Sequence, residues 1–239
     1  MIRGLLYGLK KFWSEVFSGD LLILFLSIVL AVTSISSVGF LGDRLKSSMQ
    51  MQASSILGAD LVLRSATKID SKYLDLAAAN DLDSAEMSTF LSMIITEDDN
   101  LLTSIKAVTA SYPLRGELKI VNSQGTKIKH FGSPEPGNIW IERKVLETLE
   151  LMELDKISIG NKNFIVKGII EDYPDRNSSF VGFYPVAIVN INDVDAMGVI
   201  QTGSRVVYRN LFSGTQDNLE RFEKSLEGMP ANILSLIHI

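Results

Sequence analysis

The longest apolar segment of the chain lies near its N-terminus. No charged residue occurs between Asp20 and Asp43, and the run between them, residues 21–42, is rich in Leu, Ile and Val and contains no proline. An α-helix rises about 1.5 Å per residue, so this run can cross a hydrocarbon core of roughly 30 Å. We therefore predict a transmembrane helix over residues 20–43. A cleavable signal peptide is the main alternative, but its apolar region is only about 7–15 residues long.

Small residues recur on one side of this predicted helix. Ser27, Ala31, Ser34 and Val38 follow one another at helical spacing. Because small side chains let two membrane helices approach closely, we expect this stripe to pack against another membrane helix. The alternative is that Ser and Ala are simply common in such segments.

Residues 1–19 repeat apolar positions near a helical period. Phe12 and Trp13 belong to the apolar side, whereas Lys10 and Lys11 belong to the polar side. This pattern predicts an amphipathic helix at the membrane interface, with Trp13 at headgroup depth. An ordinary leader to the span is the alternative.

Positive charges near the span indicate its direction. Arg3, Lys10 and Lys11 precede it, and only Arg44 and Lys46 follow it closely. Since cytoplasmic flanks carry the excess of Lys and Arg, the N-terminus is expected in the cytoplasm. The large domain after the span would then be extracytoplasmic.

The residues after the span alternate between strand and helix patterns. A helix is expected to leave the membrane and to end at Gly58. The predicted strands are 60–64, 84–96, 104–111, 117–121, 127–131, 138–141, 156–159, 163–171, 184–190 and 204–211. The predicted helices are 70–79, capped by Asp70, then 142–151, a short helix to Met197 capped by Asn192 or Asp193, and 215–226. Strands mixed with short helices predict an α+β domain.

Composition limits the chemistry of this domain. The 239 residues carry a net charge of -5 and contain no cysteine. Disulfides, thiol catalysis and cysteine-bound metals are therefore excluded. Mild acidity without a dense Lys/Arg stripe gives no reason to expect nucleic-acid binding.

Catalytic motifs are scarce in the sequence. His130 and His238 have no metal-like spacing, and neither a nucleophile elbow nor a Gly-rich phosphate loop is present. The acidic turn 97–99 lacks the ligand spacing of a calcium loop, so we interpret it as solvated. We predict no catalytic, cofactor-binding or metal-binding residue in this chain.

A second acidic segment, 171–176, contains Glu171, Asp172, Asp175 and Arg176. An acid/base pair could be drawn from it. We favour an ion-paired surface or a partner contact, because charged loops usually stay solvated.

Several short segments, in order, resemble the membrane subunit of the FtsX/MacB-like ABC transporters, in particular the branch of YbbP-type permeases. They are the leader and span, Leu-Gly-Ala-Asp-Leu at 57–61, Tyr-Pro-Leu-Arg-Gly at 112–116, Glu-Asp-Tyr-Pro-Asp-Arg at 171–176 and Gly-Ser-Arg-Val-Val-Tyr-Arg at 203–209. A departure occurs at 153–155, where Glu-Leu-Asp replaces the family's usual Gly-Asp. The residues that carry the resemblance are Gly58, Asp60, Tyr112, Pro113, Gly116, Pro174, Asp175, Gly203, Ser204, Tyr208 and Arg209.

The resemblance implies a MacB-like periplasmic core domain over residues 44–233, with a porter-like part and a β-rich part inserted near 113–186. It implies a permease subunit that couples cytoplasmic ATP hydrolysis to movement of the outer domain, for export or extraction of lipid-like or hydrophobic molecules. Residues 46–57 would form the stalk that transmits this movement.

The expected partners follow from the same resemblance. They are a separate ATPase subunit, which would hold the ATP and Mg²⁺ and contact residues 1–19, a second permease copy, membrane lipids and a periplasmic protein. The expected location is the bacterial cytoplasmic (inner) membrane.

The last residues, 234–239, read Leu-Ser-Leu-Ile-His-Ile. This hexapeptide is what a common transposase sequencing adaptor encodes, and the family has three further membrane helices. We therefore expect a truncated reading of a longer gene, in which His238 has no biological meaning. A genuine short C-terminus is the alternative.

Two other function classes stay open. One is a single-span sensor or adaptor whose outer domain binds a ligand or a protein. The other is a membrane-anchored enzyme, which the missing catalytic set disfavours.

Overall fold

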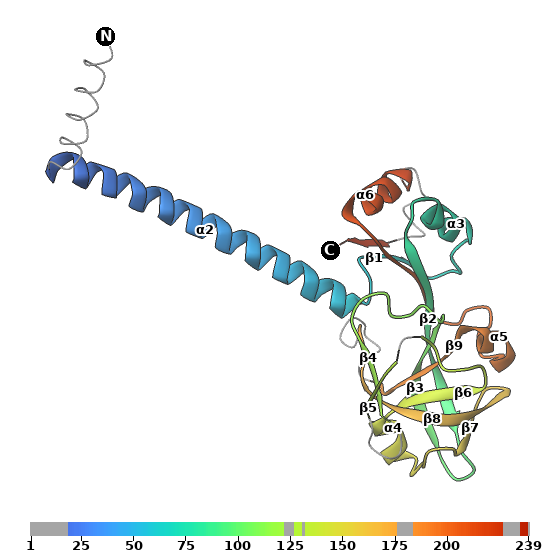
Figure 1. Ribbon diagram of the computed structural model, residues 1–239. Helices are drawn as coiled ribbons and strands as arrows, with labels where there is room; N and C mark the ends of the chain where they lie inside the picture. The colour runs from blue at the N-terminus through green and yellow to red at the C-terminus, as the bar shows by residue number, and fades with distance from the viewer. Residues whose placement is uncertain (1–18, 122–126, 131, 176–183, 227–234, 239) are drawn as a thin grey trace. The chain divides into compact units, whose positions relative to one another are not determined.

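The structure is a computed structural model that describes residues 19–121, 127–130, 132–175, 184–226 and 235–238. The chain divides into two compact units, Met1–Met51 and Gln52–Ile239. Helix α2 (Gly19–Leu57) begins in the first unit and ends in the second (Figure 1).

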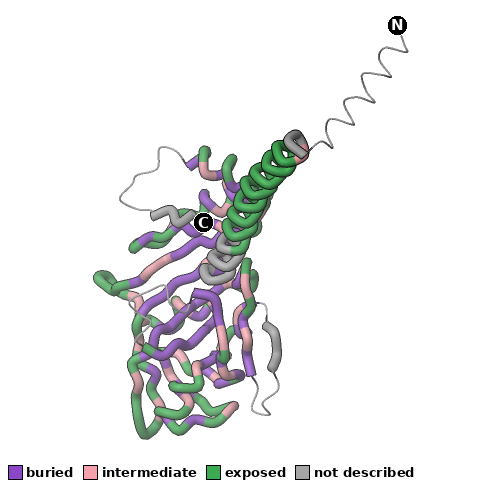
Figure 2. The backbone as a smooth tube through the Cα atoms, turned by 90° about the vertical axis from the view of Figure 1, so that its left-hand side faces the viewer, coloured by how far each residue is buried: buried purple, intermediate pink, exposed green. Residues whose placement is uncertain are grey.

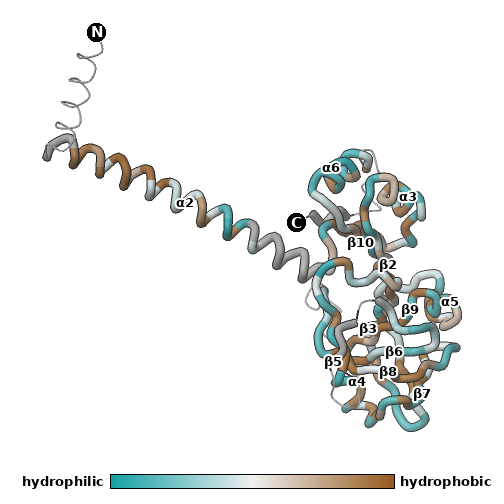
Figure 3. The backbone as a smooth tube through the Cα atoms, in the orientation of Figure 1, coloured by the Kyte–Doolittle hydropathy of each residue, from teal (hydrophilic) through white to brown (hydrophobic). Residues whose placement is uncertain are grey.

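Helix α2 contains the apolar run of the sequence. Its segment Leu22–Lys46 is long and apolar enough to cross a membrane, and none of the tested window is buried within the structure. Figure 2 shows this stretch as exposed, and Figure 3 shows its N-terminal half as hydrophobic. An apolar helix without protein cover is typical of a segment surrounded by lipid. The predicted membrane helix is therefore supported.

The small-residue stripe lies on α2, where Ser27, Ala31, Ser34 and Val38 are all exposed. The Ser27 hydroxyl donates to the Leu24 carbonyl at 2.7 Å, so the helix itself satisfies this polar group. Packing against a further helix stays a prediction. The predicted interfacial residues Lys10, Lys11 and Trp13 lie outside the described residues.

The second unit is a mixed domain built around one sheet. Its strands in the described residues are β1 (Leu61–Ser65), β2 (Asp83–Ile95), β3 (Asn100–Val108), β4 (Leu118–Val121), β5 (Lys127–His130), β6 (Asn138–Glu142), β7 (Lys156–Ile159), β8 (Lys162–Asp172), β9 (Val186–Asn190), β10 (Val206–Ser213) and β11 (Ser235–His238). Its helices are α3 (Lys72–Ala79), α4 (Arg143–Thr148), the 3₁₀ helix η2 (Ile191–Asp193), α5 (Val194–Met197) and α6 (Gln216–Ser225). The strand order is β11-β1-β10-β2-β3-β9-β6-β8-β4-β5. The α+β class is therefore confirmed.

Strand β7 closes part of this sheet into a barrel. It pairs with β8 along its length and with β2 at Ile94 and Ile95, so β2, β3, β9, β6, β8 and β7 form a ring of paired strands. Inward-facing aliphatic side chains, such as Ile105, Ile139 and Val189, fill the ring and are fully buried. Closure removes exposed strand edges and encloses the main core.

Helices α3 and α6 cover the other end of the sheet, over β1 and β10 (Figure 1). Leu61, Leu63 and Phe212 from the strands pack against side chains of both helices, and the rings of Phe212 and Phe222 lie 4.8 Å apart. The described residues thus form three apolar clusters: one inside the ring, one that includes Tyr112 and Trp140, and one under α3 and α6.

Most predicted elements are present, although several of their bounds and caps differ from the prediction. The third predicted strand, 104–111, occupies Asn100–Val108, and the predicted helix 142–151 is limited to Arg143–Thr148. The N-cap residue of α3 is Ser71 and not the predicted Asp70, although the Asp70 carboxylate accepts from the Lys72 N–H at 3.0 Å.

Asp193, one of the two predicted caps, lies at the N-cap position of α5, but its side chain makes no capping hydrogen bond. Asn190 caps η2 by accepting from the Asn192 N–H, whereas the Asp193 carboxylate accepts from the Gly137 N–H at 2.9 Å and pairs with Lys162. A buried carboxylate that is engaged by these tertiary donors is not available to cap its own helix.

Strands β4 to β8 lie inside the predicted insert 113–186, whose boundaries stay a prediction. At the C-terminal side, β11 pairs antiparallel with β1, with His238 opposite Leu61. Backbone pairing depends little on side-chain identity, so the proposed origin of residues 234–239 also stays a prediction.

Candidate functional site

Segments that carry the family resemblance meet where helix α2 ends. Residues 58–60, 112–116 and 173–175 contact one another there, and Arg209 of β10 joins them. We call this set of contacts the junction. It belongs entirely to the second unit and lies at the only covalent link from α2 into the domain.

Gly58 fits the junction because it lacks a side chain. Its φ of +75° is left-handed, which ends the helix, and a Cβ at this position would lie 3.2 Å from the Cβ of Pro174. Its carbonyl accepts two backbone N–H groups, from Leu114 at 3.0 Å and Arg115 at 2.9 Å. The end of α2 is therefore hydrogen-bonded to the loop at 114–115 and lies close to the loop at Pro174.

Asp60 and Arg115 form a fork-like ion pair beside Gly58. The Arg115 Nη2 lies 2.8 Å from the Asp60 carboxylate, and Nε lies 3.0 Å from both of its oxygens. This hydrogen bonding raises the pKa of Arg115. The Gly214 N–H also donates to Asp60 at 3.3 Å, so the carboxylate joins the loop at 115 to the end of β10.

Tyr112 lies at the centre of the junction and is fully buried. Its peptide bond to Pro113 is cis, and its hydroxyl donates to the Pro174 carbonyl at 3.3 Å. Burial, followed by the nearby Asp175 carboxylate, raises the pKa of Tyr112 far above its ordinary value of 10.0. The phenol therefore stays protonated and keeps donating this bond.

The burial of Asp175 contradicts the interpretation of segment 171–176 as a charged surface. Its side chain is only 4% exposed and lies 2.7 Å from Nη1 of Arg209 and 3.4 Å from Nζ of Lys106. The Lys106 ammonium also contacts the Asp175 carbonyl oxygen and lies 4.5 Å from the centre of the Tyr173 ring. Asp172 does form the expected ion pair at the surface, with Lys119 at 3.0 Å.

Lys106 is a junction residue that the sequence reasoning missed. It lies within the apolar strand β3 and is buried. Burial lowers the pKa of Lys106 below its ordinary 10.5, and the Asp175 carboxylate partly opposes this shift. A single lysine inside an apolar strand was the available signal, because buried lysines are almost always paired.

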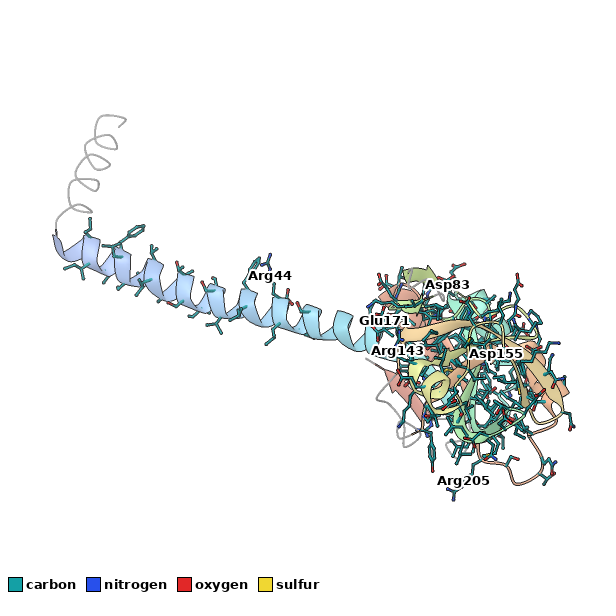
Figure 4. All side chains as sticks on the ribbon, turned by 90° about the horizontal axis from the view of Figure 1, so that it is seen from below. Arg44, Asp83, Arg143, Asp155, Glu171 and Arg205 are labelled. Atoms are coloured by element: carbon teal, nitrogen blue, oxygen red, sulfur yellow. The ribbon has the colours of Figure 1, made fainter. Side chains whose placement is uncertain are left out.

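Three resemblance residues lie outside the junction. Gly203, at φ +94°, and Ser204 form a turn before β10, in which the Ser204 hydroxyl accepts from the Gln201 N–H at 2.9 Å. Figure 4 shows Arg205, the next residue, projecting outward. Tyr208 lies on the face of β10 opposite Arg209, since successive strand residues alternate.

The charged groups of the junction contact one another across distant parts of the sequence. The charged groups are engaged in ion pairs, and the described residues contain no group of His, Asp or Glu side chains that could hold a metal ion. The acidic turn 97–99 is exposed, as expected. This arrangement can hold segments together and transmit displacement between them.

Comparison with known families identifies the fold of this chain. The MacB-like periplasmic core domain family matches residues 21–223. The chain belongs to this family. The match includes the apolar part of α2 and all four junction segments, so the resemblance inferred from short motifs is confirmed over most of the chain.

A similar relative is YbbP of Escherichia coli (strain K12), an uncharacterised ABC transporter permease. The two are 30% identical over 217 residues, which cover 91% of this chain and 26% of the relative. This chain therefore spans about a quarter of the length of the curated relative it matches.

Solved structures are more distant. The periplasmic region of MacB from Actinobacillus actinomycetemcomitans has 11% identity and a TM-score of 0.49, and the match covers 80% of this chain and 94% of that structure. The extracellular domain of the ABC-type transporter YknZ from Gram-positive bacteria has 8% identity and a TM-score of 0.49, and the match covers 74% of this chain and 100% of that structure.

Proposed function

We propose that this chain is the first membrane helix and the outer domain of an ABC transporter permease, and that the junction couples the two. The observation that carries the proposal is the double hydrogen bond from the Leu114 and Arg115 N–H groups to the Gly58 carbonyl. A displacement of the end of α2 must move the loop at 114–115 or break both bonds. The family membership and the similarity to a permease support the assignment.

In this proposal a separate ATPase subunit hydrolyses ATP with Mg²⁺ on the cytoplasmic side, and this chain itself has no enzymatic activity. A second permease copy completes the transporter in the inner membrane, surrounded by lipids and assisted by a periplasmic protein. The N-terminus is cytoplasmic and the main domain periplasmic. The transported molecules are lipid-like or otherwise hydrophobic.

The proposal predicts association with an ATPase in native membranes. The permease that contains this chain should co-purify with an ATPase subunit after gentle extraction. Absence of that subunit would contradict the transporter proposal and favour a single-span sensor or adaptor.

Coupling through the junction can be tested separately. Because residues 1–239 contain no cysteine, Asn163→Cys, at an exposed position of β8, provides a single labelling site on the outer domain. ATP addition to the complex should change the signal of a label there. Gly58→Ala should retain ATPase binding but reduce this change, whereas Gly137→Ala, a left-handed glycine with open space around it, should not. Equal behaviour of both variants would contradict coupling at Gly58.

A further inference from the structure

A cavity of about 390 Å³ lies over one face of β2 and β10. Its floor contains Glu86, Ser88, Tyr208 and Asn210, and residues near α3 and α5 form its walls. We call it the α3–α5 cleft. Its volume falls in the range of small-molecule sites.

The register of the strands fixes the floor of the cleft. Asn210 is directly opposite Glu86, and Tyr208 is directly opposite Ser88. Side chains alternate along a strand, so these four share one face, whereas Arg209 between them points to the junction on the other face. The cleft and the junction are thus separate sites on opposite sides of the same two strands.

Polar groups on this floor lack partners. Asn210 is 3% exposed, and its Nδ2 is buried with no hydrogen-bond partner. Across the described residues, no hydrogen bond or ion pair engages the Glu86 carboxylate or the Tyr208 hydroxyl. Buried polar groups in native proteins nearly always bond to something, so an unsatisfied amide beside a free carboxylate points to a missing ligand.

We propose that the α3–α5 cleft binds a saccharide, or a similar polyhydroxylated ring. A pair of neighbouring hydroxyls can accept from Asn210 and donate to Glu86, because each hydroxyl both donates and accepts. The Tyr208 ring and the aliphatic walls at Ile69 and Val194 suit the C–H faces of such a ring. The rim carries both Lys68 and Asp195, which favours a neutral ligand over a strongly charged one.

The test uses the full chain in nanodiscs, labelled with 3-fluorotyrosine and observed by ¹⁹F NMR. The probes are methyl glucoside and N-acetylglucosamine for a free sugar, and maltotriose for a longer glycan. Tighter binding of the monosaccharides assigns a free sugar as the source, and tighter binding of maltotriose assigns a glycan chain. Tyr208→Phe identifies the reporter resonance, which we expect to shift saturably with at least one of the probes. Cyclohexanol, a ring with one hydroxyl, should bind more weakly.

Variants decide whether the cleft is responsible. Asn210→Leu should weaken saccharide binding about tenfold or more, and Asn163→Leu, an exposed asparagine in strand β8, should leave it unchanged. If Asn210→Leu disturbs the other tyrosine resonances, Glu86→Gln is used in its place. Glu86→Gln keeps the shape of the side chain and should also weaken saccharide binding. No shift with any saccharide, equal binding of cyclohexanol, or unchanged binding in the cleft variants would overturn the proposal.

Discussion

Arg209 and Asn210 are neighbours in β10, yet the side chain of Arg209 is paired and that of Asn210 is not. On the junction face, Arg209 is buried against Asp175, which also contacts Lys106. On the cleft face, the Asn210 amide is just as buried and has no partner. One strand therefore carries a satisfied ionic cluster and an unsatisfied polar floor.

The difference predicts that the two faces respond differently to substitution. Breaking a buried ion pair leaves an uncompensated charge, so the junction should tolerate little change. Removing an unsatisfied buried amide costs little and can even stabilise the folded protein. Substitutions in the cleft should therefore leave folding intact but weaken ligand binding. The following predictions test this contrast.

The largest effect is expected for Asp175→Ala. It leaves Lys106 and Arg209 buried without their shared carboxylate, so the free energy of unfolding should fall by about 3–5 kcal/mol. Urea unfolding followed by fluorescence of the buried Trp140 measures it, in a Trp13→Phe background. Asp172→Ala, which breaks the exposed pair with Lys119, should have a much smaller effect. Equal effects would contradict the buried cluster.

Gly58→Ala should come next. Left-handed backbone costs an L-residue roughly 1–2 kcal/mol, and the new Cβ would also press on Pro174. Gly137→Ala has a similar φ of +82° with nothing within 4 Å, so it measures the backbone strain alone. The same urea assay should show a larger loss for Gly58→Ala. An identical loss of unfolding free energy in the two variants would show that the contact with Pro174 does not contribute.

Tyr112→Phe should change how the free energy of unfolding depends on pH in the alkaline range. Above pH 10.0 the folded protein keeps the phenol proton of Tyr112, whereas the unfolded chain releases it. The stabilisation of the folded wild type by the protonated phenol is therefore complete below pH 10.0 and is lost as the pH rises above it. Near neutral pH the variant should lose about 0.5–1.5 kcal/mol with the hydrogen bond to Pro174. This difference should shrink as the pH rises above 10.0. A difference that stays constant up to pH 11 would contradict the prediction.

The smallest effect on stability is expected for Asn210→Leu. Because it removes an unsatisfied amide, its unfolding free energy should be unchanged or higher by up to about 1 kcal/mol. Arg209→Met, one residue away, should be clearly destabilising since it leaves Asp175 with less compensation. Destabilisation of both to a similar degree would show that the two faces do not differ.

Periodicity predicted local structure well. The alternation in 156–159 and 163–171, with a Gly-Asn turn between them, corresponds to β7 and β8, and Gly58 does end α2. These features depend on short-range sterics and on the spacing of apolar residues, which can be read from the sequence. Asp193 lies at the predicted N-cap position of α5 but does not cap the helix with its side chain, because a distant lysine and a distant N–H engage its carboxylate.

The candidate site was predicted only in part. Short motifs pointed to Gly58, Tyr112 and Asp175, but their mutual contact and the roles of Lys106 and Arg115 were not visible. The partners of Asp175 are 69 and 34 residues away along the chain, so no local pattern links them. Asn210 likewise gave no signal, because burial without a partner is a property of the packed sheet.

By itself, the sequence determined an apolar helix long enough for a membrane, an α+β domain after it and the residues that place it in its family. Tertiary structure alone decided that β7 closes a barrel, that the charge of Asp175 is buried, and that Arg209 and Asn210 meet different surroundings. Local structure follows from neighbours along the chain. Burial and partnering follow from which distant segments pack together, and those contacts set the free energy of every polar group.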